Sequence, residues 1–278
     1  MELDEVLKHA AAAAGPVVVL TGAGISAASG IPTFRGPEGY WTVGSRHYQP
    51  EEMATQAMFR RAPAMVWSWY LYRRGICLAA LPNSGHRALV ELERALPDRF
   101  VLLTQNVDGL HLRAGNSPAR TWQVHGNLHW MRCASECTPA PVPVPEACGA
   151  PARGEPLGGG EAALLRCPQC GDWMRPHVLW FDETYDEPRY RFESALEAAR
   201  RAALLLVVGS SGATTLPMYV GGIVARRGAA MIDVDPAPNA FATLAQASPA
   251  GCCVAGAAAV VLPELVQRCI AVIGGAAS

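Results

Sequence analysis

The sequence has 278 residues, of which 50% are hydrophobic and only 17% are charged. This composition is typical of a folded protein and argues against a disordered chain, and the length allows one large domain that carries a smaller insertion. The 23 basic and 24 acidic residues nearly cancel, so no overall charge attracts nucleic acid or an anionic membrane.

Neither the N-terminus nor the apolar runs predict export or a membrane span. The chain starts with an acidic segment, residues 2–5, where a secretory leader would be basic. The longest dense apolar run, residues 202–208, is far shorter than the ~20 residues that span a bilayer. Paired cysteines in such a chain favour metal binding over disulfides. We therefore expect a cytoplasmic protein that binds neither nucleic acid nor a membrane.

Short apolar runs alternate with helix-like segments along the chain. Residues 84–96 and 190–203 have apolar side chains at helical spacing with charges on the opposite face. Apolar runs between such helices are typical of a buried parallel sheet. The sequence thus predicts an α/β fold with a Rossmann-like, doubly wound parallel sheet, whose strands are residues 17–20, 100–103, 122–124, 204–208 and 229–234.

Two regions interrupt this alternation. Residues 36–81 are rich in aromatic residues, Met and Arg, and we expect them to form a cofactor loop and the helical part of a small domain. Residues 127–175 hold two cysteine pairs joined by a Pro-, Gly- and Ala-rich stretch that cannot build much core, which predicts a module held by metal. The large domain then comprises residues 1–35, 82–126 and 176–278.

The first predicted strand ends in a glycine-rich turn, Gly22-Ala23-Gly24-Ile25-Ser26-Ala27. Glycines in such a G-x-G-x-x-A turn allow the backbone to approach a pyrophosphate. The alternative is a glycine-rich turn without a ligand. A dehydrogenase would show an acidic residue ~20 positions later, but residues 29–36 form a Pro- and Gly-rich loop instead. Phe34 and Arg35 in this loop could cover a nucleotide; alternatively, Phe34 fills the core and Arg35 is solvated.

Polar side chains follow two of the predicted strands. The segment Gln105-Asn106-Val107-Asp108 comes directly after one strand, and His125-Gly126 follows the next. Ligands of open α/β sheets bind at the carboxyl ends of the strands. Because imidazole is the usual general base near neutral pH, His125 is the candidate base among the seven histidines.

The cysteine pairs predict a closed, structural zinc site. Cys133, Cys137, Cys167 and Cys170 offer four thiolates, which suit tetrahedral Zn²⁺ without an open position. The alternative is four unrelated reduced cysteines. Cys148 has no paired neighbour and is left out of the site. The remaining cysteines have apolar neighbours in the sequence and are expected in the core; they are Cys77, Cys252, Cys253 and Cys269.

Taken together, these motifs resemble one family, the sirtuins, which are NAD-dependent protein lysine deacylases. The glycine-rich turn, the loop at residues 30–36, the segment at residues 105–108, His125-Gly126, the cysteine pairs and residues 175–181 occur in that family's order. The resemblance covers nearly the whole chain and extends to bacterial members and to the class that removes succinyl and malonyl groups.

The resemblance implies a reaction and a set of site residues. NAD⁺ is the co-substrate, the acyl-lysine side chain of another protein is the substrate, and the products are free lysine, nicotinamide and O-acyl-ADP-ribose. Catalysis is assigned to His125 as general base together with Asn106 and Asp108. The implied cofactor contacts are Gly22, Ala23, Gly24, Ser26, Thr33, Phe34, Arg35, Tyr40, Trp41, Gln105, Asn106, Val107, Asp108, Gly209, Ser210, Ser211, Asp233, Val234, Asp235 and Ala257; the implied substrate contacts include Val178, Trp180 and Phe181.

Tyr70 and Arg73 match the Tyr-x-x-Arg pair that binds the acyl carboxylate in the desuccinylase and demalonylase class. Three residues apart on a predicted helix, they share one face, and a guanidinium beside a phenol can hold a carboxylate. The alternative is an arginine that only reaches solvent. We therefore expect removal of acidic acyl groups, with deacetylation as a further activity.

The sequence also departs from the family pattern. Ala28 stands where Glu is common, Ser210 where Thr is usual, Asp233 where Asn is usual, and Asp182 where Gly is usual in the peptide-pairing segment. A carboxylate at position 182 could repel succinyl-lysine or attract basic flanking residues. Two other interpretations stay open: an NAD hydrolase or ADP-ribosyltransferase that uses the same pocket, and a nucleotide-sensing module without catalysis.

Overall fold

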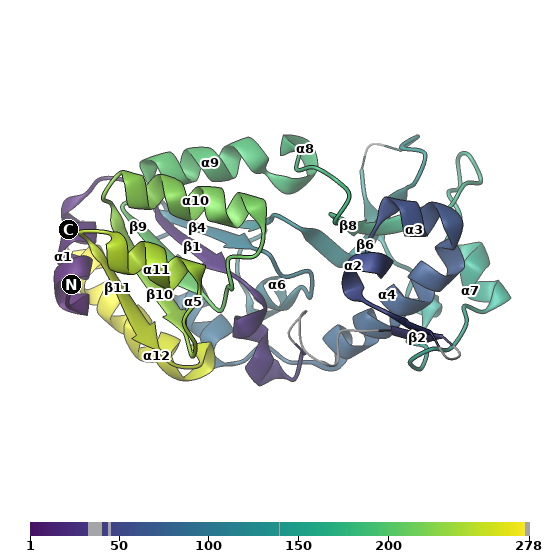
Figure 1. Cartoon of the computed structure of the whole chain (residues 1–278), viewed down its shortest axis with the longest axis horizontal. Coiled ribbons are helices and arrows are strands. Elements are labelled where there is room, and N and C mark those ends of the chain that lie inside the picture. The colour runs from purple at the N-terminus through teal and green to yellow at the C-terminus, as the bar shows by residue number, and fades with distance from the viewer. Residues whose placement is uncertain (33–40, 44–45, 139, 276–278) are drawn as a thin grey trace.

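A parallel sheet forms the larger lobe of the protein (Figure 1). The computed structural model describes residues 1–32, 41–43, 46–138 and 140–275. Within these residues the sheet has six strands in the order β11-β10-β9-β1-β4-β5. The strands are β1 (Val17–Thr21), β4 (Phe100–Thr104), β5 (Thr121–Gln123), β9 (Leu204–Val208), β10 (Ala230–Asp235) and β11 (Gly251–Ala255).

Strand β1 lies at the centre of the sheet, between β4 and β9. Leu20 aligns with Leu103 of β4 and with Val207 of β9, and every residue of β1 is buried. A strand covered on both faces needs a continuous apolar run, which explains Val17-Val18-Val19-Leu20. The chain adds β4 on one side of β1 and later adds β9 on the other side. The carboxyl end of β1 is therefore the topological switch point, where such sheets bind ligands.

Helices cover both faces of the sheet. On one face α1 (Leu3–Ala12), α5 (Ser84–Ala95) and α12 (Ala258–Cys269) pack through residues such as Leu7, Leu89 and Leu262. On the other face α9 (Phe192–Arg201), α10 (Thr215–Arg226) and α11 (Ala240–Ala247) pack through residues such as Leu196, Val220 and Phe241. Figure 1 shows this three-layer arrangement, which confirms the predicted α/β fold. Short helical segments complete the lobe: η1 (Ala23–Ser29), α6 (Leu110–Ala114), α8 (Glu187–Tyr190) and η3 (Ile270–Gly274).

The smaller lobe is built from two separate stretches of the chain. Its core contains Trp67, Trp69, Met131 and Trp180. Strand β8 pairs with β6 as far as Val178, so the small sheet continues past the predicted boundary at residue 175. The elements are the hairpin β2 (Trp41–Val43) and β3 (Arg46–Tyr48), helices α2 (Pro50–Met53), α3 (Gln56–Arg61) and α4 (Pro63–Ala79), strands β6 (Gly126–Cys133), β7 (Val142–Pro143) and β8 (Met174–Val178), η2 (Glu146–Cys148) and α7 (Gly159–Leu164).

The last strand of the large sheet, β11, was not predicted. It is an edge strand in which buried residues are outnumbered by partly or fully exposed ones. For the same reason the expectation that Cys252 and Cys253 are core residues is wrong: Cys252 is partly exposed and Cys253 is exposed. Cys77 and Cys269 are buried, as predicted. Among the described helices, none has the length and apolar character needed to cross a membrane.

Candidate active site and metal centre

The glycine-rich turn after β1 packs directly against the end of β9. The Gly22 N–H donates to the Val208 carbonyl at 3.0 Å, and the Gly24 N–H donates to the Gly209 carbonyl at 2.9 Å. A Cβ on Gly24 would lie 2.6 Å from the Gly209 Cα, which no side chain tolerates. The glycines are therefore required by the packing of the chain itself, and η1 leaves this turn at the switch point of the sheet.

Asn106 and Asp108 connect the turn after β1 to the segment after β4. The Asn106 Nδ2 donates to the Gly22 carbonyl at 3.0 Å and to Ser26 Oγ at 3.2 Å, and Ser26 Oγ donates to Asp108 Oδ2 at 2.7 Å. The Leu110 N–H donates to Asp108 Oδ1 at 2.8 Å. Burial raises the pKa of Asp108, and these two hydrogen bonds oppose the shift. The network fixes both side chains before any ligand binds.

Gln105 makes a second connection, from β4 to the loop after β9. Its Nε2 donates to Ser210 Oγ at 2.8 Å, and its Oε1 accepts from Thr214 Oγ1 at 2.9 Å. Ser210, one of the positions that depart from the sirtuin pattern in the sequence, supplies a hydroxyl acceptor to Gln105. The carboxyl ends of β1, β4 and β9 are thus joined by side-chain hydrogen bonds.

His125, the candidate base, follows β5 beside this network. Its Nδ1 lies 3.1 Å from the Gln105 carbonyl, and its Nε2 lies 2.8 Å from the Tyr185 hydroxyl. Burial lowers the pKa of His125 to about 4, against the opposing effect of the Gln105 carbonyl. The ring is therefore neutral at physiological pH, which is the form that a general base requires.

Gly126 allows the substrate segment to approach His125. Its φ is +84°, and a Cβ there would lie 2.1 Å from the His177 carbonyl oxygen. The Leu179 N–H donates to the His125 carbonyl at 3.0 Å. His125-Gly126 therefore lies beside the end of β8, where Val178, Trp180 and Phe181 lie.

Two of the predicted substrate residues, Tyr70 and Trp180, contact each other in the core of the small lobe. Trp180 is buried, and its Nε1 donates to the Tyr70 hydroxyl of α4 at 2.9 Å. Phe181 is half exposed. Arg73, one turn beyond Tyr70, lies with its guanidinium 5.3 Å from the centre of the Trp69 ring. Tyr70 retains its own proton for a further partner, since its oxygen is the acceptor toward Trp180.

Asp182 does not project freely into the substrate groove. Its carboxylate accepts from the N–H groups of Gln56 at 2.7 Å and Ala57 at 3.1 Å, which are the first residues of α3. Thr55 accepts from the next free N–H, that of Met58, at 3.0 Å. The charge of Asp182 is thus directed at a helix N-terminus, where negative charge is favoured.

The remaining predicted cofactor residues extend the site toward β10 and β11. The Val234 carbonyl accepts from the Gly209 N–H at 2.9 Å, while Asp235 ends β10 and Ala257 is the exposed residue before α12. Burial raises the pKa of Asp233 to about 6. Its Oδ2 accepts from Asn239 Nδ2 at 3.0 Å, and its Oδ1 is buried without a partner among the described residues. Such an orphaned acceptor suits a ligand hydroxyl.

The structure places only part of the remaining predicted cofactor residues. Thr33, Phe34, Arg35 and Tyr40 lie outside the described residues. Trp41 pairs with Tyr48 in the β2–β3 hairpin. Ala23 and Val107 lie in the turns after β1 and β4, and Ser211 follows Ser210 after β9. Every other predicted cofactor residue thus lies at the carboxyl edge of the large sheet or just beyond it.

The four predicted metal ligands form one cluster. The sulfur atoms of Cys133, Cys137, Cys167 and Cys170 all lie within 4.8 Å of one another, and several pairs are 3.4–3.5 Å apart. A tetrahedral zinc ion with Zn–S bonds of about 2.3 Å requires similar sulfur spacing. Cys148 is buried and is not part of the cluster. The site fits structural Zn²⁺ and lies in the small lobe, away from His125.

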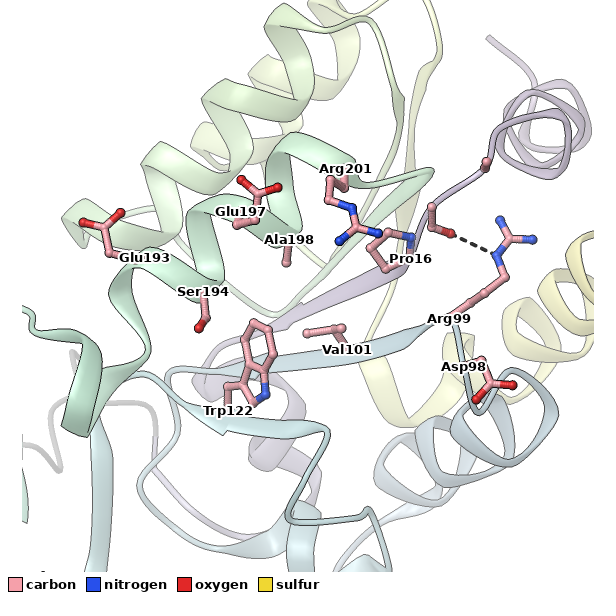
Figure 2. Close-up of a pocket in the computed structure, with 12 residues that line it drawn as sticks. Pro16, Asp98, Arg99, Val101, Trp122, Glu193, Ser194, Glu197, Ala198 and Arg201 are labelled. Carbon is pink, nitrogen blue, oxygen red and sulfur yellow. Dashed lines mark hydrogen bonds between the residues drawn. The ribbon is translucent and has the colours of Figure 1, made fainter.

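A separate groove of about 820 Å³ lies at the amino ends of β1 and β4 (Figure 2). Pro16, Arg99, Trp122, Glu197 and Arg201 contribute to its lining, and Arg99 donates to the Gly15 carbonyl at 2.9 Å. Its walls carry charges of both signs. None of the described residues assigned to the site around His125 lines this groove.

Comparison with known proteins identifies the family. Residues 22–215 match the sequence profile of the Sir2 family. The chain belongs to the Sir2 family. A protein of Leptospira interrogans (serovar Lai), named NAD-dependent protein deacylase, is 38% identical over 253 residues, which are 91% of this chain and 92% of the relative.

Two solved sirtuin structures have the same fold. A Sir2 homologue in complex with NAD superposes with a TM-score of 0.77 at 34% identity, covering 96% of this chain and 93% of the other. A Sir2 protein with a p53 peptide and NAD⁺ superposes with a TM-score of 0.71 at 26% identity, covering 96% and 97%. The predicted family and fold are confirmed.

Sequence reasoning missed three polar residues of this site. Tyr185 contacts His125, Thr214 holds Gln105, and His129 Nε2 lies 2.8 Å from the Asp108 carbonyl. Thr214 and Tyr185 lie on segments that return to the site only in three dimensions. Their spacing in the sequence carries no signal for this contact.

Proposed function

We propose that this sirtuin removes acyl groups from lysine side chains of other proteins, with NAD⁺ as co-substrate. The relatives named NAD-dependent protein deacylase confirm the class of activity predicted from the sequence. The observation that carries the proposal is the convergence of Asn106, Asp108 and His125 at the carboxyl edge of the sheet. A peptide complex of a structural neighbour supports a protein substrate.

The residues at this edge fit NAD⁺. The glycine turn after β1 packs against the loop after β9 at the switch point of the sheet, and the orphaned Asp233 Oδ1 offers an acceptor to a ribose hydroxyl. We assign the cofactor to Gly22, Gly24, Ser26, Gln105 and Ser210 with their neighbours. Bound NAD⁺ supplies an electrophilic ribose carbon with nicotinamide as its leaving group.

His125 acts as general base at Nε2. Its Nδ1–H is committed to the Gln105 carbonyl, so Nε2 carries the lone pair that takes a proton from a ribose hydroxyl. Asn106 and Asp108, held by Ser26 and Gly22, orient the nicotinamide ribose. The buried setting limits the entry of water, which would compete with the acyl oxygen.

The acyl group that we assign to this enzyme is acidic. Tyr70 and Arg73 lie three residues apart on α4, and burial raises the pKa of the Tyr70 hydroxyl while the charge of Arg73 opposes this shift. The Trp180 Nε1–H donates to the Tyr70 hydroxyl oxygen at 2.9 Å and holds the phenol in place. A phenol O–H together with a guanidinium holds the carboxylate of succinyl- or malonyl-lysine.

Arg73→Met tests this assignment. We expect kcat/KM for a succinyl peptide to fall by about 100-fold, the range of a lost charge-assisted hydrogen bond, with less than about 5-fold loss for the matched acetyl peptide. The Arg73→Lys variant should lose less succinyl activity than Arg73→Met, because lysine retains the charge but lacks the planar guanidinium. Equal losses for both peptides would show that Arg73 supports the fold and does not select the acyl group.

Two further assignments belong to this proposal. The four-cysteine Zn²⁺ site stabilises the small lobe and takes no part in the chemistry. The protein acts in the cytoplasm on acyl-lysine side chains, without binding nucleic acid. The alternative, hydrolysis of NAD⁺ or transfer of ADP-ribose by the same pocket, differs in its product: it forms no O-acyl-ADP-ribose.

A further inference from the structure

Tyr185 lies against the proposed general base. Its hydroxyl is 2.8 Å from His125 Nε2, and the ring centres are 5.8 Å apart. Because the Gln105 carbonyl can only accept, Nδ1 carries the ring proton and Nε2 of the neutral imidazole is an acceptor. The Tyr185 hydroxyl therefore donates to the very nitrogen that a general base uses.

The surroundings of Tyr185 hold the phenol in this position. Its ring stacks on Phe192 of α9, with ring centres 6.0 Å apart and planes at 27°. Burial raises the pKa of the Tyr185 phenol to about 12, and the Leu216 N–H in the first turn of α10 and the Thr214 side chain oppose this shift. Tyr185 itself belongs to the connection between β8 and α8, four residues after Phe181 of the substrate segment. The phenol thus joins three elements around one imidazole.

We propose that Tyr185 is a positioning residue that occupies the base lone pair of His125 until the ribose hydroxyl displaces it, and that it thereby suppresses hydrolysis of NAD⁺ without acyl-lysine. The inference rests on the proposed role of His125. One lone pair accepts one strong hydrogen bond, so a hydroxyl must displace the phenol to reach the base. A ribose hydroxyl fixed by bound substrate does this more readily than an unplaced water molecule.

The suppressed side reaction is hydrolysis of NAD⁺ at the ribose carbon that bears nicotinamide. The oxygen of water bonds to the ribose carbon, the bond from that carbon to nicotinamide breaks, and its electron pair leaves with nicotinamide. His125 takes the proton of water and passes it to solvent. The products are nicotinamide, ADP-ribose and one proton, and the step requires Nε2 to be free.

Tyr185→Phe tests the proposal because it keeps the ring and removes only the hydroxyl. We expect hydrolysis of NAD⁺ without peptide to rise about 5-fold, the equivalent of one net hydrogen bond. The double variant with His125→Ala should lose this gain, since the gain passes through the base. Tyr190→Phe is the matched control: this buried ring stacks on His177, 6.0 Å away, and does not touch His125.

A second readout needs no substrate. In ¹⁵N NMR of the ligand-free protein, the His125 ring should be in the neutral Nδ1–H form, with the resonance assigned from its loss in His125→Ala. Removing the hydroxyl in Tyr185→Phe should shift the Nε2 resonance of His125, whereas Tyr190→Phe should leave it unchanged. A change in folding would shift many resonances and not that of a single ring nitrogen.

Three results would overturn the proposal: an unchanged rate of hydrolysis in Tyr185→Phe, a gain that persists without His125, or an unchanged Nε2 resonance. Failure of the proposed function looks different. If the wild type hydrolyses NAD⁺ but deacylates no peptide, while Tyr185→Phe still raises hydrolysis through His125, the inference holds and the deacylase assignment fails.

Discussion

At the scale of single residues, Asp182 shows how a departure from a family pattern can be absorbed. A carboxylate replaces the usual glycine beside the substrate groove, yet it caps the N-terminus of α3 through Gln56 and Ala57. Because its charge is engaged there, it does not meet the acyl group as an unpaired anion. The proposed preference for acidic acyl groups is thus compatible with Asp182.

Asp182→Ala should therefore affect stability more than specificity. Loss of a helix cap costs about 1 kcal/mol of unfolding free energy, and we expect this value in urea denaturation. Asp182→Asn, which retains an acceptor, should lose less. A variant with wild-type stability and better use of succinyl-lysine would show instead that the Asp182 charge faces the substrate.

The pKa of His125 gives a second prediction at this scale. Burial lowers it to about 4, so the base stays neutral well below the usual range of histidine, near 6.5. We expect kcat/KM for an acyl peptide to remain level down to about pH 5 and to fall below it. An acid limb centred near pH 6.5 would mean that His125 is accessible to water or is not the base.

Residue identities at the site were predictable where the sequence makes a local demand. Gly22, Gly24 and Gly126 are required by close backbone approach, and Asn106, Asp108 and His125 follow strands directly. Tyr185 could not be predicted, because its contact with His125 depends on how the β8–α8 connection folds back. Asp233 was assigned by resemblance, and its orphaned oxygen is visible only in three dimensions.

At the scale of elements, the strands buried on both faces were the easiest to predict. β1, β4 and β9 are short continuous apolar runs, and their observed bounds differ from the predicted ones by at most one residue. β11 was missed because an edge strand needs no such run: in its sequence, Gly-Cys-Cys-Val-Ala, only Gly251 is buried, and the positions after it alternate between partly and fully exposed. Edge strands obey weaker packing constraints than central ones.

The zinc module gives the prediction at this scale. The Pro- and Gly-rich segment between the cysteine pairs has little core of its own, so its order depends on the metal. Chelation of zinc should make residues 138–166 sensitive to limited proteolysis while the large sheet stays resistant. Cleavage sites can be mapped by mass spectrometry, with zinc added back as the control. An unchanged digestion pattern would contradict the assignment of the four cysteines.

At the scale of the whole molecule, buried histidines make stability depend on pH. Burial lowers the pKa of His86, His125 and His177 to about 4 and that of His111 to about 3. Below their unfolded pKa near 6.5, the unfolded chain binds protons that the folded chain does not. This linkage destabilises the fold as the pH decreases.

Two buried carboxyl groups oppose this trend. Burial raises the pKa of Asp108 and brings that of Asp233 to about 6. As the pH decreases, these two groups therefore take up protons in the folded chain before they do so in the unfolded chain. Four histidines outweigh two carboxyl groups, and we expect the free energy of unfolding to fall between about pH 6.5 and 4. Urea denaturation at several pH values measures this; a flat or rising profile would contradict the buried, neutral state of the histidines.

The central claim is that the converging residues at the carboxyl edge of the sheet transfer an acyl group from lysine to ADP-ribose. Mass spectrometry of the protein incubated with NAD⁺ and matched acetyl- and succinyl-lysine peptides tests it most directly. We predict deacylated peptide together with O-acyl-ADP-ribose, more from succinyl than from acetyl peptide, and loss of both in His125→Ala. Intact peptides beside consumed NAD⁺, or products that persist without His125, would contradict the account.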